Sequence, residues 1–175
     1  MKRREKSRRA LFIGRFQPFH LGHLHAVKYI LSKAEHVIIG IGSALESHTA
    51  RNPFTAAERT EMIELSIAEA GLERNRISII PIPDIGIHRL WPSLVEILVP
   101  PIDIVFTNDP LTATLFRERK YRVEPIPFLQ RGIFSGTEFR RRVVKGEDWR
   151  QLVPKSVAIF LEKERLVDRI KVVNS

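Results

Sequence analysis

One stretch of the sequence decides the fold: residues 11–23, which read LFIGRFQPFHLGH. Its first four residues, Leu11 to Gly14, are apolar and end in glycine, which predicts a buried β-strand. From about Gly22 to Ala34, apolar residues recur every three or four positions, which predicts a helix. A buried strand that turns directly into a helix is typical of a parallel sheet covered by helices.

The same alternation continues along the chain. Short apolar runs predict further strands at residues 37–42, 77–80, 102–106 and 121–125, and helical spacing predicts helices that end near Gly71, span residues 90–98 and 111–119, and end near Lys145. Capping boxes at residues 55–58 and 135–138 mark the starts of the first and last of these helices. The sequence therefore predicts an α/β fold, a Rossmann-like open parallel sheet with helices on both faces, as a single domain over residues 10–175.

Composition excludes several classes of protein. The chain has 29 Lys and Arg against 20 Asp and Glu, a net charge of +9, and 43% hydrophobic residues. This apolar fraction suits a soluble domain, and no apolar run is long enough to cross a bilayer or to act as a secretory signal. We therefore expect a cytoplasmic protein without membrane contact. The absence of cysteine excludes disulfides, Fe–S clusters and cysteine nucleophiles.

The first nine residues carry much of the positive charge. Six are basic and one is acidic, which accounts for +5 of the net +9. We interpret residues 1–9 as a disordered basic arm that precedes the first strand, so that deleting it should leave turnover within a few-fold. The charge also suggests a nucleic-acid-binding module as an alternative. Because aromatic residues do not alternate with the cations as stacking platforms would, nucleic acid is not the expected partner.

The turn after the first strand is the expected ligand site. Ligands of open α/β sheets bind outside the carboxyl ends of the strands, and the free N–H groups at a helix start favour phosphate. His20 and His23 could both face that phosphate, because Gly22 between them lets the backbone come close. The P-loop pattern is absent. Zinc bound by His20, His23 and His25 is a minor alternative, because no H-E-x-x-H pattern accompanies them.

Four segments together resemble the archaeal-type nicotinamide-nucleotide adenylyltransferases of the HxGH nucleotidyltransferase superfamily. They are residues 14–23 (GRFQPFHLGH), 40–49 (GIGSALESHT), 51–59 (RNPFTAAER) and 135–142 (SGTEFRRR). The resemblance implies transfer of the adenylyl group of ATP to nicotinamide mononucleotide, which gives NAD and pyrophosphate. It also implies Mg²⁺ carried by ATP, no metal-binding residue of the protein itself, and a homo-oligomer, a hexamer in the family. Another acceptor, such as flavin mononucleotide or phosphopantetheine, stays open.

The resemblance also implies site residues. The catalytic set is His20, His23, Arg15, Arg51 and Arg140; the ATP and phosphate set is Gly14, Phe16, Gly22, Ser135 and Thr137; and the acceptor set is Ser43, Asp84, Trp91 and Asn108. Histidine donors and arginine forks suit a reaction between two polyanions that needs no covalent nucleophile. Trp91 would stack on the nicotinamide ring, although a core tryptophan is the plain alternative. Arg141 and Arg142 are expected to be solvated.

Overall fold

A parallel sheet organises the computed structural model, which describes residues 7–175. In this part of the chain five strands form one sheet in the order β3-β2-β1-β4-β5, with every neighbouring pair parallel. The strands are β1 (Ser7–Gly14), β2 (Ala34–Ile41), β3 (Ile77–Pro81), β4 (Ile104–Phe106) and β5 (Arg122–Glu124). The chain adds β2 and β3 on one side of β1 and then crosses over to β4 and β5. The switch point, where open α/β sheets bind ligands, therefore lies between β1 and β4.

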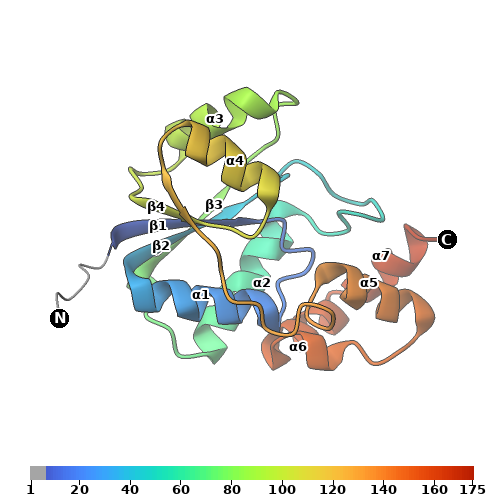
Figure 1. Cartoon of the computed structure of the whole chain (residues 1–175). Coiled ribbons are helices and arrows are strands. Elements are labelled where there is room, and N and C mark those ends of the chain that lie inside the picture. Colours follow the sequence, from blue (N-terminus) through green and yellow to red (C-terminus); the bar gives the residue numbers. More distant parts are fainter. Residues whose placement is uncertain (1–6) are drawn as a thin grey trace.

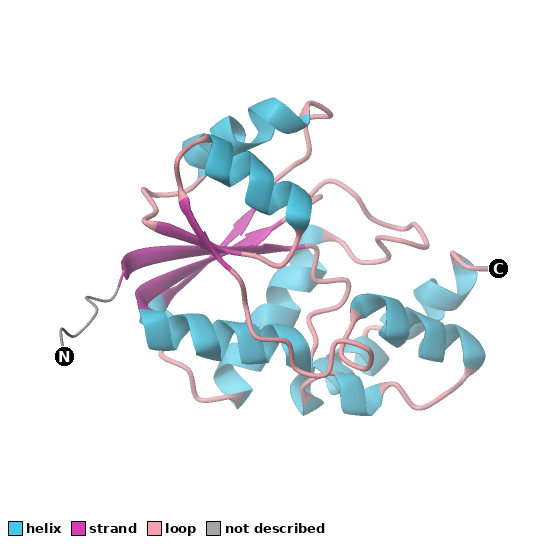
Figure 2. Ribbon diagram, viewed as in Figure 1, coloured by secondary structure: helices cyan, strands magenta, loops and turns pink. Residues whose placement is uncertain are grey.

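Helices cover both faces of this sheet, as the sequence predicts (Figures 1 and 2). One face packs on α1 (Leu21–Lys33) and α2 (Ala56–Glu69), and the other on α3 (Trp91–Leu98) and α4 (Pro110–Glu118). Because side chains alternate along a strand, Phe12 joins the first core and Leu11 the second. Among the residues described, no helix is both long enough and apolar enough to span a membrane.

Three further helices gather beyond the carboxyl ends of the strands (Figure 1): α5 (Gly136–Lys145), α6 (Lys155–Lys163) and α7 (Leu166–Val172). α6 packs against α2, and α7 packs against both α5 and α6. Of these three helices, only α5 was expected from the sequence. The buried residues Val157 and Leu161 of α6 have helical spacing. α7 has only seven residues, which is too short for a clear helical period in the sequence.

The first strand begins earlier than predicted and includes part of the predicted basic arm. β1 begins at Ser7, not at Leu11, and its start pairs with β2, with Arg9 opposite His36. Arg8 and Arg9 are exposed, so this end of the strand lacks the apolar pattern by which buried strands are recognised. The remaining predicted arm, residues 1–6, lies outside the described residues.

Deleting residues 1–9 should therefore destabilise the protein. The deletion removes two hydrogen bonds between β1 and the chain before β4: Arg9 N–H donates to Asp103 Oδ2 at 2.8 Å, and Asp103 N–H donates to Arg9 O at 2.9 Å. Two such bonds predict a melting temperature lower by about 2–10 °C, measurable by calorimetry. Deletion of residues 1–6 keeps every described contact and is the control. Equal melting temperatures for the two deletions would contradict this expectation.

The first predicted capping box is confirmed. Thr55 Oγ1 accepts from Glu58 N–H at 3.2 Å, and Glu58 Oε2 accepts from Thr55 N–H at 2.9 Å. Arg169 of α7 donates to both carboxylate oxygens of Glu58, at 2.7 and 2.8 Å, and to Pro53 O at 3.1 Å. The C-terminal helix is thereby fixed to the start of α2 and to the loop before it.

Candidate active site

His20 and His23 form a closed pair at the start of α1. His20 is the residue that caps the helix, and its Nδ1 accepts from His23 N–H at 3.3 Å, while His23 Nδ1 accepts from His20 N–H at 3.2 Å. The two rings stack with their centres 3.6 Å apart. Because each Nδ1 is an acceptor, the proton of each neutral ring lies on Nε2. Each histidine can therefore offer one Nε2–H donor to a ligand.

Burial keeps both rings neutral. It lowers the pKa of His20 from 6.5 to about 3. The pKa of His23 is also held well below its ordinary value, first by burial and then by the proximity of His20. Neither ring is therefore an imidazolium at neutral pH, so in the free protein they act as neutral hydrogen-bond donors.

The stability of the protein should fall as the pH drops below about 6.5. In the unfolded chain His20 titrates near 6.5, whereas in the folded protein it stays neutral down to about pH 3. Between these values the unfolded state binds a proton that the folded state does not, which lowers the free energy of unfolding by up to ~1.4 kcal/mol per pH unit for this histidine. Urea denaturation at pH 7 and pH 5 should show a smaller loss for His20→Asn, which retains a capping side chain. The same pH dependence in both proteins would contradict the low pKa.

Two aromatic rings pack against His23 of the histidine pair. Phe16 packs edge-on against His23 with ring centres 4.8 Å apart, and Phe19 lies 5.4 Å from the same ring. Phe16 is only 1% exposed, and its ring supports His23. Its place in the ATP and phosphate set stays a prediction. A Cβ on Gly14 would come within 2.8 Å of the Phe16 ring. Glycine at this position therefore makes room for that ring.

A small polar cavity of about 140 Å³ lies beside the pair. Its lining combines the two histidines with Arg15, Thr137 and Arg140. Arg140 Nη1 donates to Gln17 O at 2.8 Å. Burial lowers the pKa of Arg140, and the neighbouring charges of Arg15 and then Arg51 lower it further. Three of the predicted arginines thus lie close enough to repel one another, an arrangement that a polyanion would stabilise. Arg51 itself is exposed.

Gly136, which the site prediction omitted, is needed for this cavity. A Cβ at this position would lie 2.9 Å from Gln17 O and 3.0 Å from Arg140 Nη1. A side chain there would displace the contact between Arg140 and the turn after β1. The pattern S-G-T contained this signal, but the need for a close backbone approach becomes visible only once α5 is placed against that turn.

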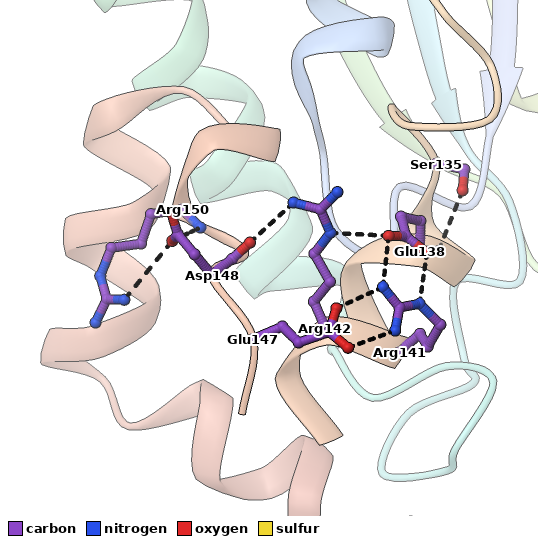
Figure 3. A network of polar contacts seen from close by, with 7 residues as sticks. All are labelled: Ser135, Glu138, Arg141, Arg142, Glu147, Asp148 and Arg150. Carbon is purple, nitrogen blue, oxygen red and sulfur yellow. Dashed lines mark hydrogen bonds and ion pairs between the residues drawn. The ribbon is translucent and has the colours of Figure 1, made fainter. Parts of the chain in front are cut away.

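An ion-pair network anchors the helix that carries Arg140 (Figure 3). Ser135 Oγ accepts from Glu138 N–H at 3.1 Å, but the second predicted capping box is incomplete because the Glu138 carboxylate binds Arg141 and Arg142 instead. Arg142 also donates to Asp148 O, in the segment after α5, at 3.0 Å. Both side chains are held in ion pairs. The side chain of Arg141 is 39% exposed, so it is solvated as expected, whereas that of Arg142 is 18% exposed and the expectation is wrong for it.

A second cavity, of about 260 Å³, shares both histidines with the small one and lies between the ends of β1 and β4. Gly22 and Ser135 line it, together with Arg131 and Phe128, whose guanidinium and ring lie 4.7 Å apart. Asn108 also lines this cavity and was predicted to bind the acceptor. Its amide is engaged with the backbone of Ile126, donating at 2.8 Å and accepting at 3.0 Å. Asn108 therefore clamps the chain after β5 and does not line the cavity that holds the other acceptor residues.

Those other acceptor residues share a third cavity, of about 310 Å³. Ser43, Asp84 and Trp91 line it with Gly14 and Arg15. Trp91 is half-buried, donates from Nε1 to Pro83 O at 3.3 Å and packs edge-on against Phe116. The cavity also includes His88 and Asp109, which sequence reasoning did not single out. Arg15 lines both this cavity and the small polar one.

The described side chains include no group of three or more His, Cys, Asp or Glu residues that could hold a metal. The alternative of a zinc site at His20, His23 and His25 therefore has no support in this part of the chain. The cationic and N–H groups around the small cavity instead suit an anionic ligand.

A parallel sheet with an H-x-G-H helix start and converging arginines at its switch point defines a nucleotidyltransferase. Residues 11–142 match the family model described as cytidylyltransferase-like. The chain is 51% identical to the nicotinamide-nucleotide adenylyltransferase of Thermococcus onnurineus over 94% of its own length and 87% of the relative's. It is 46% identical to the enzyme of that name from Archaeoglobus fulgidus over 93% of this chain and 94% of the relative. The chain therefore belongs to the nicotinamide-nucleotide adenylyltransferases of the cytidylyltransferase-like family.

Solved structures show the same fold. A bifunctional NMN adenylyltransferase/ADP ribose pyrophosphatase from Francisella tularensis superposes with a TM-score of 0.80 at 23% identity, over 96% of this chain. This chain spans about half of that protein, 53% of its length. A second structure of it, complexed with AMP and a manganese ion, superposes with a TM-score of 0.78 at 24% identity over the same shares of the two chains.

Proposed function

We propose that this protein transfers the adenylyl group of ATP to nicotinamide mononucleotide, a step of NAD biosynthesis that releases pyrophosphate. One observation carries the proposal: a small cavity with two histidine donors and two arginines shares lining residues with each of two larger cavities at the switch point of the sheet. Two nucleotides could occupy the larger cavities and bring their phosphates together between them. The family membership of the chain supports the same reaction.

The side chains favour direct in-line attack of the acceptor phosphate on the α-phosphorus of ATP. His20 and His23 donate from Nε2 to ATP phosphate oxygens, while Arg15 and Arg140 hold phosphates with planar forks. Arg51 adds positive charge from the neighbouring loop. Together these groups reduce the repulsion between the two polyanions and stabilise the leaving pyrophosphate. Ser135 and Thr137 contribute through the N-terminus of α5.

A divalent cation, Mg²⁺, is proposed to enter with ATP. The residues around the small cavity are N–H donors, so the oxygen ligands of the ion would come from the triphosphate and from water. The bound ion would neutralise phosphate charge. The manganese ion in the Francisella structure belongs to a relative that shares this fold.

The reaction can be tested by measuring pyrophosphate release with ATP, Mg²⁺ and a panel of acceptors. Nicotinamide mononucleotide should be active, and nicotinic acid mononucleotide should be accepted as well, because stacking does not depend on the amide. NAD formation confirmed by mass spectrometry completes the assay. Release with flavin mononucleotide or phosphopantetheine, but with neither nicotinamide-type acceptor, would leave only the nucleotidyltransferase class.

Replacing Trp91 with alanine should weaken acceptor binding selectively. Loss of base stacking costs about 1–3 kcal/mol, so the KM for nicotinamide mononucleotide should rise roughly 5–150-fold while the KM for ATP changes little. Trp91→Phe keeps a stacking ring and is the matched control. An unchanged acceptor KM in a folded Trp91→Ala protein would assign Trp91 to the core with Phe116.

The hexameric assembly and the cytoplasmic location stay predictions. Sedimentation of the purified full chain would measure the oligomeric state. Microscopy of a tagged chain in its native cell would show the location.

A further inference from the structure

Arg59, near the start of α2, is fully buried, with 0% of its surface exposed. Such a charge is normally paired with a carboxylate. Every hydrogen bond recorded for this guanidinium in the described residues goes instead to a backbone carbonyl. Burial of a charge is costly, and loss of the Arg59 guanidinium would leave these buried carbonyls without a hydrogen-bond donor. The position of Arg59 therefore suggests a specific role.

One carbonyl, Thr55 O at 3.1 Å, lies at the start of α2 itself, and the others come from the two loops that flank the acceptor cavity. Nη1 donates to Arg15 O at 3.0 Å, after β1, and to Gly42 O at 2.8 Å, after β2. Nη2 donates to Ser43 O at 3.1 Å, with longer contacts to Ala44 and Glu46 further along the same loop. One side chain therefore ties the ends of two neighbouring strands together.

Both loops contain backbone that needs such support. Phe16, which follows Arg15, has a φ of 51°, and Ser43 has a φ of 47°. Residues other than glycine seldom adopt this left-handed conformation, and it persists where surrounding contacts hold it. The contacts of Arg59 fall on the peptide groups beside these two residues. The contacts with Arg59 therefore stabilise the loop conformations that bring Arg15 and Ser43 to the cavity.

The charge of Arg59 also belongs to the site. Burial lowers its pKa to about 10, with Glu58 raising it and Arg15 lowering it. The guanidinium is therefore protonated at neutral pH and lies close enough to Arg15 to repel it. Such a cation under a phosphate site adds to the attraction for anionic substrates.

We propose that Arg59 is a positioning residue for the adenylyl transfer: its guanidinium ties the turn after β1 to the loop after β2 and so fixes Arg15 and Ser43 relative to each other. The proposal rests on the proposed function, because Arg15 and the acceptor cavity act in that reaction. Arg59 lines none of the three cavities and acts through these two residues.

Kinetics of two variants test it. Arg59→Met removes all donors, whereas Arg59→Lys keeps a charge and three donors and is the variant expected to fold in every case. Ile67→Ala is the matched control, because Ile67 is a buried residue of the same helix, at the end distant from the site. At temperatures well below each melting point, the Arg59 variants should raise the acceptor KM and lower kcat by about 10–100-fold, with Arg59→Lys less affected than Arg59→Met. Ile67→Ala should keep both constants within about two-fold despite a similar loss of melting temperature. Arg59 variants that behave like Ile67→Ala would overturn the proposal.

Hydrogen exchange gives a readout that does not need activity. The amides of Ala44 and Glu46 are hydrogen-bonded in the loop after β2, to Ile82 O and Ser43 O, and should exchange slowly. Their exchange should be faster in Arg59→Lys and unchanged in Ile67→Ala. Equal rates in Arg59→Lys and the unmodified protein would overturn the positioning role. If the unmodified protein forms no NAD, the proposed function fails, while this measurement still decides whether Arg59 fixes the loop.

Discussion

Replacing His23 with alanine should lower kcat by roughly 10²–10³-fold while changing the affinity for ATP much less. A donor aimed at charge that develops in the transition state contributes about 2.7–4 kcal/mol. His23 Nδ1 is occupied by the backbone N–H of His20, at 3.2 Å, so Nε2–H is the group that remains for a phosphate oxygen. Steady-state kinetics with saturating ATP and nicotinamide mononucleotide would measure the loss.

Asparagine at position 23 separates electrostatic stabilisation from proton transfer. Asparagine keeps an N–H donor but does not titrate, so His23→Asn should retain more activity than His23→Ala. Because burial holds the pKa of both histidines low, kcat of the unmodified enzyme should also be flat through the usual histidine range. If asparagine is as inactive as alanine in a folded protein, and kcat of the unmodified enzyme follows one titration near 6.5, proton transfer is essential.

His20→Ala should also reduce activity, with more of its effect on ATP binding. His20 caps α1, so this variant also loses about 1 kcal/mol of stability, and its kinetics should be measured well below its melting temperature.

The features that could be predicted from the sequence are those that depend on residues close together along the chain. Strands and helices over residues 11–145 follow from local periodicity, and the capping box at Thr55 follows from residues three positions apart. The H-x-G-H turn and its flanking arginines could be placed at one edge of the sheet, because parallel strands end at a common edge. The structure brings Arg15, His20, His23 and Arg140 together there.

The features that the sequence did not reveal concern the partners of side chains across the fold. Asn108 meets the backbone of Ile126, 18 positions away, and lines a different cavity from Ser43, Asp84 and Trp91. Its acceptor role stays a prediction. Phe16 turns its ring inward because Gly14 leaves space for it. Likewise, a sequence with 29 basic residues does not indicate that Arg59 is buried next to the site. These assignments need the packed structure, because residue type and spacing do not distinguish a side chain that faces a ligand from one that packs inside the protein.

Arg15→Ala should impair the use of both substrates, unlike any acceptor-site variant. Arg15 lines the acceptor cavity and the small polar cavity. Burial lowers the pKa of its guanidinium, the charge of Arg51 lowers this pKa further, and the charge of Asp84 raises it. An arginine that neutralises charge during phosphoryl-type transfer contributes roughly 10³–10⁵-fold to kcat, so we expect a loss of about 10³-fold together with higher KM values for ATP and for nicotinamide mononucleotide. Arg15→Lys should recover only part of this loss, because an ammonium lacks the planar fork that contacts two oxygens at once.

The matched control for Arg15 is Arg117→Ala. Arg117 is an exposed residue of α4 that lines none of the three cavities, so its removal subtracts the same charge from the protein without touching the site. Its kinetic constants should stay within about two-fold of the unmodified enzyme, because exposed charges away from the site contribute little. The decisive comparison is with Trp91→Ala, which should raise only the acceptor KM. A loss in Arg15→Ala confined to one substrate would show that Arg15 serves a single cavity, and the phosphates of the two nucleotides would then have to meet around Arg140 and the histidine pair instead.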